Sequence, residues 1–134
     1  MANEAVLVDK FSEPINMVCE NTAGMEKGTV LGLSDSRFVS ASSGAAVFGG
    51  ILAREKIASD GRTSVAVYRD GIFRMRAGGG SAIVAGELVS ISGANIIEGV
   101  NAEAQMVAGN TFGRALQTVA LGTAETIEVL VGVQ

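Results

Sequence analysis

The stretch "GTVLGLS", residues 28–34, returns 58 residues later as "GELVSIS", residues 86–92. Each begins with a glycine and continues with short apolar and hydroxyl side chains, a pattern typical of a strand that follows a turn. At the same offset, "RFV" at residues 37–39 corresponds to "NII" at residues 95–97. A repeat of this length in a chain of 134 residues predicts two similar structural units.

Two further matches follow in the same order in both halves. "FGGIL" at residues 48–52 corresponds to "FGRAL" at 112–116, an offset of 64, and "TSVAV" at 63–67 corresponds to "TIEVL" at 126–130, an offset of 63. We therefore expect pseudo-repeats over about 15–70 and 72–133, with extra residues in the segment 98–111.

The chain contains 18 glycines and one proline, and the glycines separate short runs of strand-forming residues. This composition predicts an all-β fold: a compact β-sandwich or a partly open, β-tulip-like barrel. We expect the two units to close on each other as one domain, residues 15–134, because each is too small to bury its own sheet faces. Residues 1–14 form either an N-terminal arm or a first strand. The best helical candidate is 51–58, where a strand running into a loop is the alternative.

The three glycines at 78–80 have two interpretations, a phosphate-binding loop or a corner between strands. A phosphate loop needs a following helix and, in the P-loop, a lysine. Here "SAIVAGE" follows, with no lysine and with another strand ahead. The sequence favours the corner.

Asp70-Gly71, set between two apolar-alternating runs, predicts a β-hairpin with a two-residue turn. Such a hairpin would place one set of side chains on a common face: Val65, Val67, Arg69, Ile72, Arg74 and Arg76. The arginines could pair with carboxylates of a neighbouring chain, or the face could simply be solvated. The stretch "AVLVDKF" at 5–11, outside the repeat, is either a first strand or an arm that adds to a partner's sheet edge.

Composition argues against most catalytic classes. The chain has no histidine, no tryptophan and one cysteine, so a Ser-His-Asp or Cys-His arrangement and a zinc site are not expected. Cys19 is expected to be a buried, inert thiol. The net charge of −4 and the 4 % aromatic content disfavour nucleic acid. We expect no enzyme activity, no cofactor or metal, no small-molecule substrate and no membrane partner. The first four residues lack a signal-peptide pattern, which predicts synthesis in a cytoplasm.

Taken along nearly the whole chain, these segments resemble the small capsid decoration, or cement, proteins of phages. The resemblance rests on "KGTVLGLS" (27–34), "FGGIL" (48–52) leading to "GRTSVAV" (61–67), "GIF" (71–73), "AGELV" (85–89), and "FGRAL" (112–116) closing on "IEVLV" (127–131). It implies a β-domain that binds the outer surface of the assembled major capsid protein lattice and stabilises the head. It also implies a homotrimer, located on the virion and assembled in the host cytoplasm.

In such proteins an N-terminal segment often contacts the shell, which would correspond here to residues 2–13. The residues that we expect at a capsid or subunit interface are Val6, Leu7, Val8, Phe11, Arg69, Arg74 and Arg76. Three alternatives stay open: another virion part (tail tube, fibre or spike-base domain), an enzyme that uses carboxylates alone, and a cellular adaptor or ligand-binding barrel.

Overall fold

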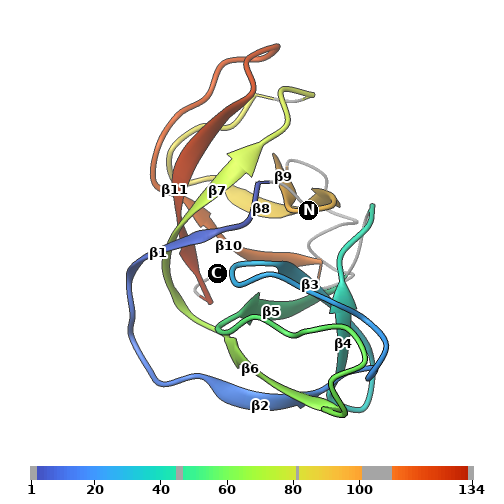
Figure 1. The fold of residues 1–134 in the computed structure, drawn as a ribbon. Helices are drawn as coiled ribbons and strands as arrows, with labels where there is room; N and C mark the ends of the chain where they lie inside the picture. The colour runs from blue at the N-terminus through green and yellow to red at the C-terminus, as the bar shows by residue number, and fades with distance from the viewer. Residues whose placement is uncertain (1–2, 45–46, 81, 101–109, 133–134) are drawn as a thin grey trace.

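The computed structural model describes residues 3–44, 47–80, 82–100 and 110–132, and within them every regular element is a β-strand. The strands form two closed, five-stranded, barrel-like sheets, one above the other in Figure 1. This confirms the prediction of an all-β fold built from two units. In the described part of the chain, no helix is long and apolar enough to cross a membrane.

The first barrel contains five strands in the closed order β2-β4-β3-β5-β6. Their bounds are β2 Ile15–Val18, β3 Val30–Asp35, β4 Phe38–Ala41, β5 Phe48–Leu52 and β6 Ser64–Tyr68. Alternation along β2 and β6 turns Met17, Val65 and Val67 inward, and these side chains pack in the interior of this barrel. The ring closes through a parallel pairing of β2 with β4.

The second barrel repeats these pairings in the order β7-β11-β10-β8-β9, and β9 pairs back to β7 in parallel. The bounds are β7 Gly71–Ala77, β8 Leu88–Gly93, β9 Ile96–Gly99, β10 Thr111–Ala115 and β11 Glu125–Val131. The same β-bulge occurs in both hairpins, between Leu33 and Asp35 in one and between Ile91 and Gly93 in the other. The two barrels therefore share one topology down to a local irregularity.

The predicted offset of 58 holds for β3 with β8 and for β4 with β9, but the later offsets are each too large by one residue. Phe48 pairs with Gly32, whereas Thr111 pairs with Ser90, so Phe48 corresponds to Thr111 and the offset is 63. The rise from 58 to 63 falls between β9 and β10, in the predicted insertion, of which residues 101–109 lie outside the described residues. For β6 and β11 the offset is 62, because Val67 and Val129 are the equivalent inward-facing residues.

We expected the two units to close on each other, but each one closes on itself. Five strands suffice because strand twist brings the first and third strands of each unit into parallel contact. The larger core still joins the units, since Val30 and Ile51 of the first barrel pack with residues of the second. The stacked rings of Phe48 and Phe112, with centroids 4.4 Å apart, lie in this shared core.

The predicted hairpin at Asp70-Gly71 is wrong. The two partners of β6 are β2 and β5, whereas β7 pairs with β11 along its length and with β1 and β9 on its other edge. The Asp70-Gly71 step instead carries the chain from one barrel to the other. The common arginine face is therefore not formed, because Val65 and Val67 point into the first barrel.

The N-terminal segment forms strand β1, Val6–Asp9, which pairs antiparallel with β7 of the second barrel. Just before it, the Ala5 amide donates to the Gly28 carbonyl of the first barrel, at 2.8 Å. Figure 1 shows β1 crossing the molecule at the level where the two barrels meet. The segment thus connects the barrels through backbone hydrogen bonds to both.

Two remaining predictions concern local structure. β5 ends at Leu52 and the chain continues as a loop that forms a single bridge between Lys56 and Met25, so the strand-to-loop alternative is right for 51–58. The glycines at 78–80 follow the end of β7 and precede a bridge at Ile83, with no helix after them. This is the predicted corner between strands.

Candidate functional site

The outer side of β1 and β7 presents apolar and basic side chains together. Val6 lies directly opposite Arg74, and Leu7 lies opposite Phe73. Side chains of directly paired residues point to the same side of a sheet, so Val6 and Arg74 face outward while Leu7 and Phe73 face the core. Val6 and Val8 are 57 % and 44 % exposed. We call Val6, Val8, Arg74 and Arg76 the β1–β7 face.

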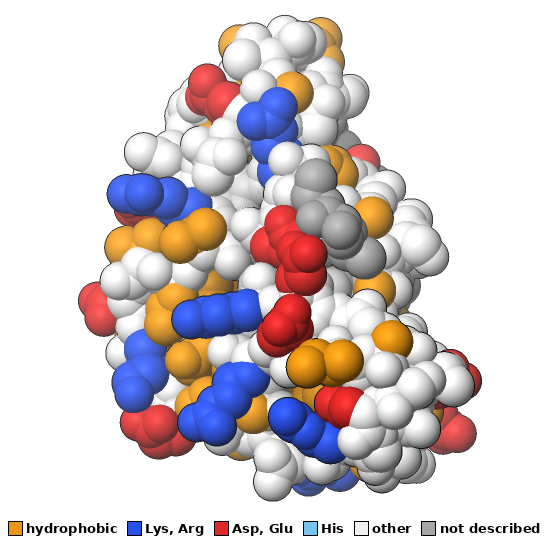
Figure 2. Space-filling model, in the orientation of Figure 1, with side chains coloured by type: hydrophobic (Ala, Val, Ile, Leu, Met, Phe, Trp, Pro, Cys, Tyr) orange, Lys and Arg blue, Asp and Glu red, His pale blue; other side chains and the backbone are white. Residues whose placement is uncertain are grey.

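The two arginines of this face have no ion-pair partner among the described residues. Arg74 lies opposite Glu128 of β11, yet no salt bridge joins them. Arg74 and Arg76 are two residues apart on one strand, which places their stems about 7 Å from each other. On the view in Figure 2, basic and apolar side chains lie side by side over the part of the molecule where β1 and β7 run. This surface suits a partner that offers both apolar groups and carboxylates.

The other residues expected at an interface lie elsewhere. Leu7 is partly buried against the larger core. The Arg69 guanidinium lies 5.5 Å from the centre of the Phe48 ring and donates to the Phe48 carbonyl at 3.0 Å, so this side chain has an internal role. Phe11 is 50 % exposed in the link between β1 and β2. That link is held near the β1–β7 face by a hydrogen bond of 2.8 Å from the Ser12 hydroxyl to the Asp70 carboxylate.

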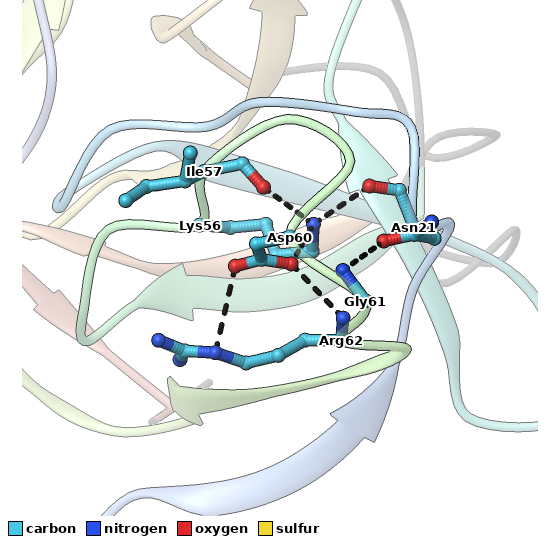
Figure 3. A network of polar contacts seen from close by, with 6 residues as sticks. All are labelled: Asn21, Lys56, Ile57, Asp60, Gly61 and Arg62. Carbon is cyan, nitrogen blue, oxygen red and sulfur yellow. Dashed lines mark hydrogen bonds and ion pairs between the residues drawn. The ribbon is translucent and has the colours of Figure 1, made fainter.

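Sequence reasoning missed a buried ion pair in the first barrel, shown in Figure 3. The Lys56 side chain is 0 % exposed, and its ammonium lies 2.8 Å from an Asp60 carboxylate oxygen. It also donates to the backbone carbonyls of Asn21 and Ile57, each at 2.8 Å. The three donors of the ammonium thus have three acceptors. The only signal in the sequence was the four-residue spacing of Lys56 and Asp60, which occurs here in a loop.

In the network around Lys56 the charges are paired and the ammonium donors are satisfied. The hydrogen bond from Lys56 lowers the pKa of Asp60, with a second contribution from the Arg62 backbone amide, so Asp60 is ionised and its charge balances the lysine. Cys19 is buried, and loss of hydration raises the pKa of its thiol, which keeps it protonated and unreactive. Among the described residues, no group of three or more acidic or thiol side chains is placed to hold a metal ion.

A second surface feature lies on the outer side of β2 and β6. Asn16 pairs with Ala66, and Val18 pairs with Ser64, so these residues face away from the barrel interior. A depression of about 220 Å³ on this side is lined by Asn16, Ser64 and Ala66, and its walls also include Arg54 and Arg62. Both surfaces carry arginines without a salt bridge in the described part of the chain: Arg54 at the depression, and Arg74 and Arg76 on the β1–β7 face.

Comparison with known proteins found no protein-family model that matches the chain and no similar curated protein at a significant level. The described chain presents surface features such as the β1–β7 face and the depression on the outer side of β2 and β6.

Proposed function

We propose that this protein is a phage capsid decoration, or cement, protein that binds the outer surface of the assembled major capsid protein lattice. In this proposal it acts as a homotrimer and stabilises the head, with no catalytic step. The sequence segments that resemble such proteins span both barrels. The observation that carries the proposal is the β1–β7 face, where exposed valines and unpaired arginines lie together on a paired sheet.

The chemistry of this face supports binding to a protein surface. Exposed apolar groups gain free energy when a partner removes them from water, and unpaired guanidinium groups form bidentate hydrogen bonds with carboxylates. Val6 and Arg74 lie on neighbouring strands, so their relative positions are fixed before binding. A surface that is already ordered loses little conformational entropy in the complex.

Preferential binding to the assembled lattice would stabilise the head by linkage. A protein that binds the closed shell more tightly than free subunits shifts the equilibrium toward the shell. Many copies on one particle add their contributions, and a trimer would engage several neighbouring subunits at once. Such a function requires complementary surfaces and no reactive side chain.

The number of copies per particle tests this proposal. We expect this protein in purified virions at a fixed, simple ratio to the major capsid protein, measured by quantitative mass spectrometry. A few copies per particle would favour a tail or spike component instead. Absence from particles would refute both virion assignments.

Point substitutions are better suited than truncation to test the N-terminal segment. Ala5 is 7 % exposed and Leu7 packs against the larger core, so removing residues 2–13 would also uncover core side chains. Val6→Asp changes only the outward side of β1. We expect this variant to remain folded and to bind capsids more weakly than the wild type.

A further inference from the structure

We infer that the depression on the outer side of β2 and β6 is a binding site for a single carboxylate, an Asp or Glu side chain of the shell partner. This inference rests on the proposed function and deepens it by naming a second contact and its chemistry. It starts from the positions of Arg54 and Arg62, which line the depression together with Asn16 and Ser64.

Both arginines have guanidinium N–H donors that are available to a ligand. Arg54 has no ion-pair partner among the described residues. Arg62 contacts Asp60 only through Nε, at 3.5 Å, and its side chain is 60 % exposed, so its terminal nitrogens are open to a ligand. Asp60 is already engaged by Lys56 at 2.8 Å. The fork of a guanidinium group matches the two oxygens of a carboxylate.

The other charges around the depression limit the ligand to one negative group. Glu55 also lines it and forms no salt bridge with either arginine, so it reduces the positive potential without filling the site. Arg37 stands next to it, since its guanidinium donates to the Asn16 carbonyl. The local balance is therefore modestly positive, which suits one carboxylate and disfavours a polyanion such as nucleic acid.

The size and position of the depression favour a side chain over a free metabolite. A volume of about 220 Å³ is below the range of about 300–1,000 Å³ that is usual for small-molecule pockets. Figure 2 shows basic side chains over the position of β2 and β6 as well as over β1 and β7. One partner surface could therefore contact both regions.

The first test measures co-sedimentation with capsids. The double variant Arg54→Gln/Arg62→Gln should bind at least about tenfold more weakly than the wild type, since it removes two charge-assisted contacts. Lys27→Gln is the matched control, because Lys27 is an exposed lysine without an ion-pair partner in the described chain, and its affinity should stay within about twofold. Glu55→Gln should strengthen binding. Unchanged affinity of the double variant would overturn the inference and leave the proposed function standing.

The second test does not need capsids and separates the ligand classes. The wild-type protein is titrated with a soluble glutamate-rich peptide and, in parallel, with inorganic phosphate, while NMR follows the side-chain Nε–Hε signals of Arg54 and Arg62. We expect the peptide to shift both signals and the double variant to abolish the response of the neighbouring Ser64 amide. Tighter binding of phosphate would refute the carboxylate assignment, as would the absence of a shift with the peptide. If wild-type protein fails to bind capsids, the proposed function is refuted, and this titration still decides the carboxylate site.

Discussion

Lys56 in the first barrel and Val119 in the second occupy equivalent places, yet their buried side chains are accommodated by different means. Each forms the single bridge that joins two loops, Lys56 with Met25 and Val119 with Ile83. Both are about 1 % exposed. The ammonium of Lys56 is satisfied by a carboxylate and two carbonyls, whereas Val119 packs in the larger hydrophobic core.

This difference separates the role of the strands from that of the loops. The strand pattern specifies both barrels, since the order of pairing is the same in each. The loop after β5 supplies Asp60 and the Ile57 carbonyl, so a buried charge is tolerated there. A buried charge without such acceptors would have to remain unpaired. The groups that accommodate the buried ammonium of Lys56 are therefore local to the loops of the first barrel.

The largest effect is expected when the charge is moved to the second barrel. Val119→Lys would place an ammonium in the larger hydrophobic core, where Thr123 stands at the position equivalent to Asp60 and supplies no carboxylate, and should lower the free energy of unfolding by about 4 kcal/mol. Urea denaturation measures this. Leu121→Lys is the control, because Leu121 is 69 % exposed on the same loop, and should change stability by less than about 0.5 kcal/mol. Equal losses of unfolding free energy in Val119→Lys and Leu121→Lys would contradict the view that the second barrel cannot accommodate a buried ammonium.

The next effect comes from two equivalent glycines, Gly28 and Gly86, which have φ angles of +91° and +93°. A Cβ at Gly28 would clash with the Ala5 carbonyl oxygen, whereas at Gly86 it would meet nothing within 4 Å. Gly86→Ala should cost about 1 kcal/mol for the backbone conformation alone, and Gly28→Ala about 3 kcal/mol because β1 must also move. Hydrogen exchange should show faster exchange at Val6–Asp9 only in Gly28→Ala. If both variants lose the same stability, the close contact between Gly28 and the Ala5 carbonyl does not hold β1 in place.

Removal of the charge from the first barrel is expected to have a smaller effect. Lys56→Met keeps an unbranched apolar stem but leaves the Asn21 and Ile57 carbonyls without their donor, which should lower the free energy of unfolding by about 2 kcal/mol. Lys27→Met removes an exposed charge and should leave stability within about 0.5 kcal/mol. A more stable Lys56→Met variant would mean that desolvation of the ammonium destabilises the fold by more than its ion pair and hydrogen bonds stabilise it.

The smallest expected effect depends on pH. The folded-state pKa of Asp60 is lowered, first by the hydrogen bond from Lys56. Its contribution to stability is therefore present above the ordinary aspartate pKa and is lost as the pH falls through the lowered folded value. Glu26 has the opposite sign, because a hydrogen bond shared with Glu4 raises its pKa. In a measurement of stability against pH, the opposite contributions of Asp60 and Glu26 would overlap. NMR titration of the Asp60 carboxyl follows this one group and avoids the overlap. In Lys56→Met the pKa of Asp60 should rise; an unchanged value would show that Lys56 does not set it.

The sequence predicted the strands better than their partners. The match of 28–34 with 86–92 identified β3 and β8, because a strand that follows a turn has a local pattern of glycine and apolar residues. The offset of 64 was wrong, since it aligned Phe48 with Phe112, whereas Phe48 corresponds to Thr111 in register. The alignment matched the two phenylalanines because they are identical, although they are not equivalent in register. Instead, Phe112 stacks on Phe48 across the barrels.

The candidate sites depend on long-range pairing that a local pattern does not contain. The hairpin at Asp70-Gly71 was predicted from local turn chemistry, but Asp70 lacks the positive φ that a type I′ turn needs, and the edges of β7 pair with strands that are distant in sequence. Val6 and Arg74 were both expected at an interface, yet only the β1–β7 ladder makes them neighbours. Arg69 could not be separated from them before its contact with Phe48 was known.

The most direct test of the proposed function compares binding to assembled capsids and to free capsid subunits. Wild-type protein should co-sediment with capsids and show no comparable affinity for free subunits. The variant Arg74→Glu/Arg76→Glu should bind capsids at least about tenfold more weakly, while Lys27→Glu, an exposed charge change of the same kind, should stay within about twofold. Equal binding of the wild type to capsids and free subunits, or wild-type affinity of the double variant, would contradict binding through the β1–β7 face.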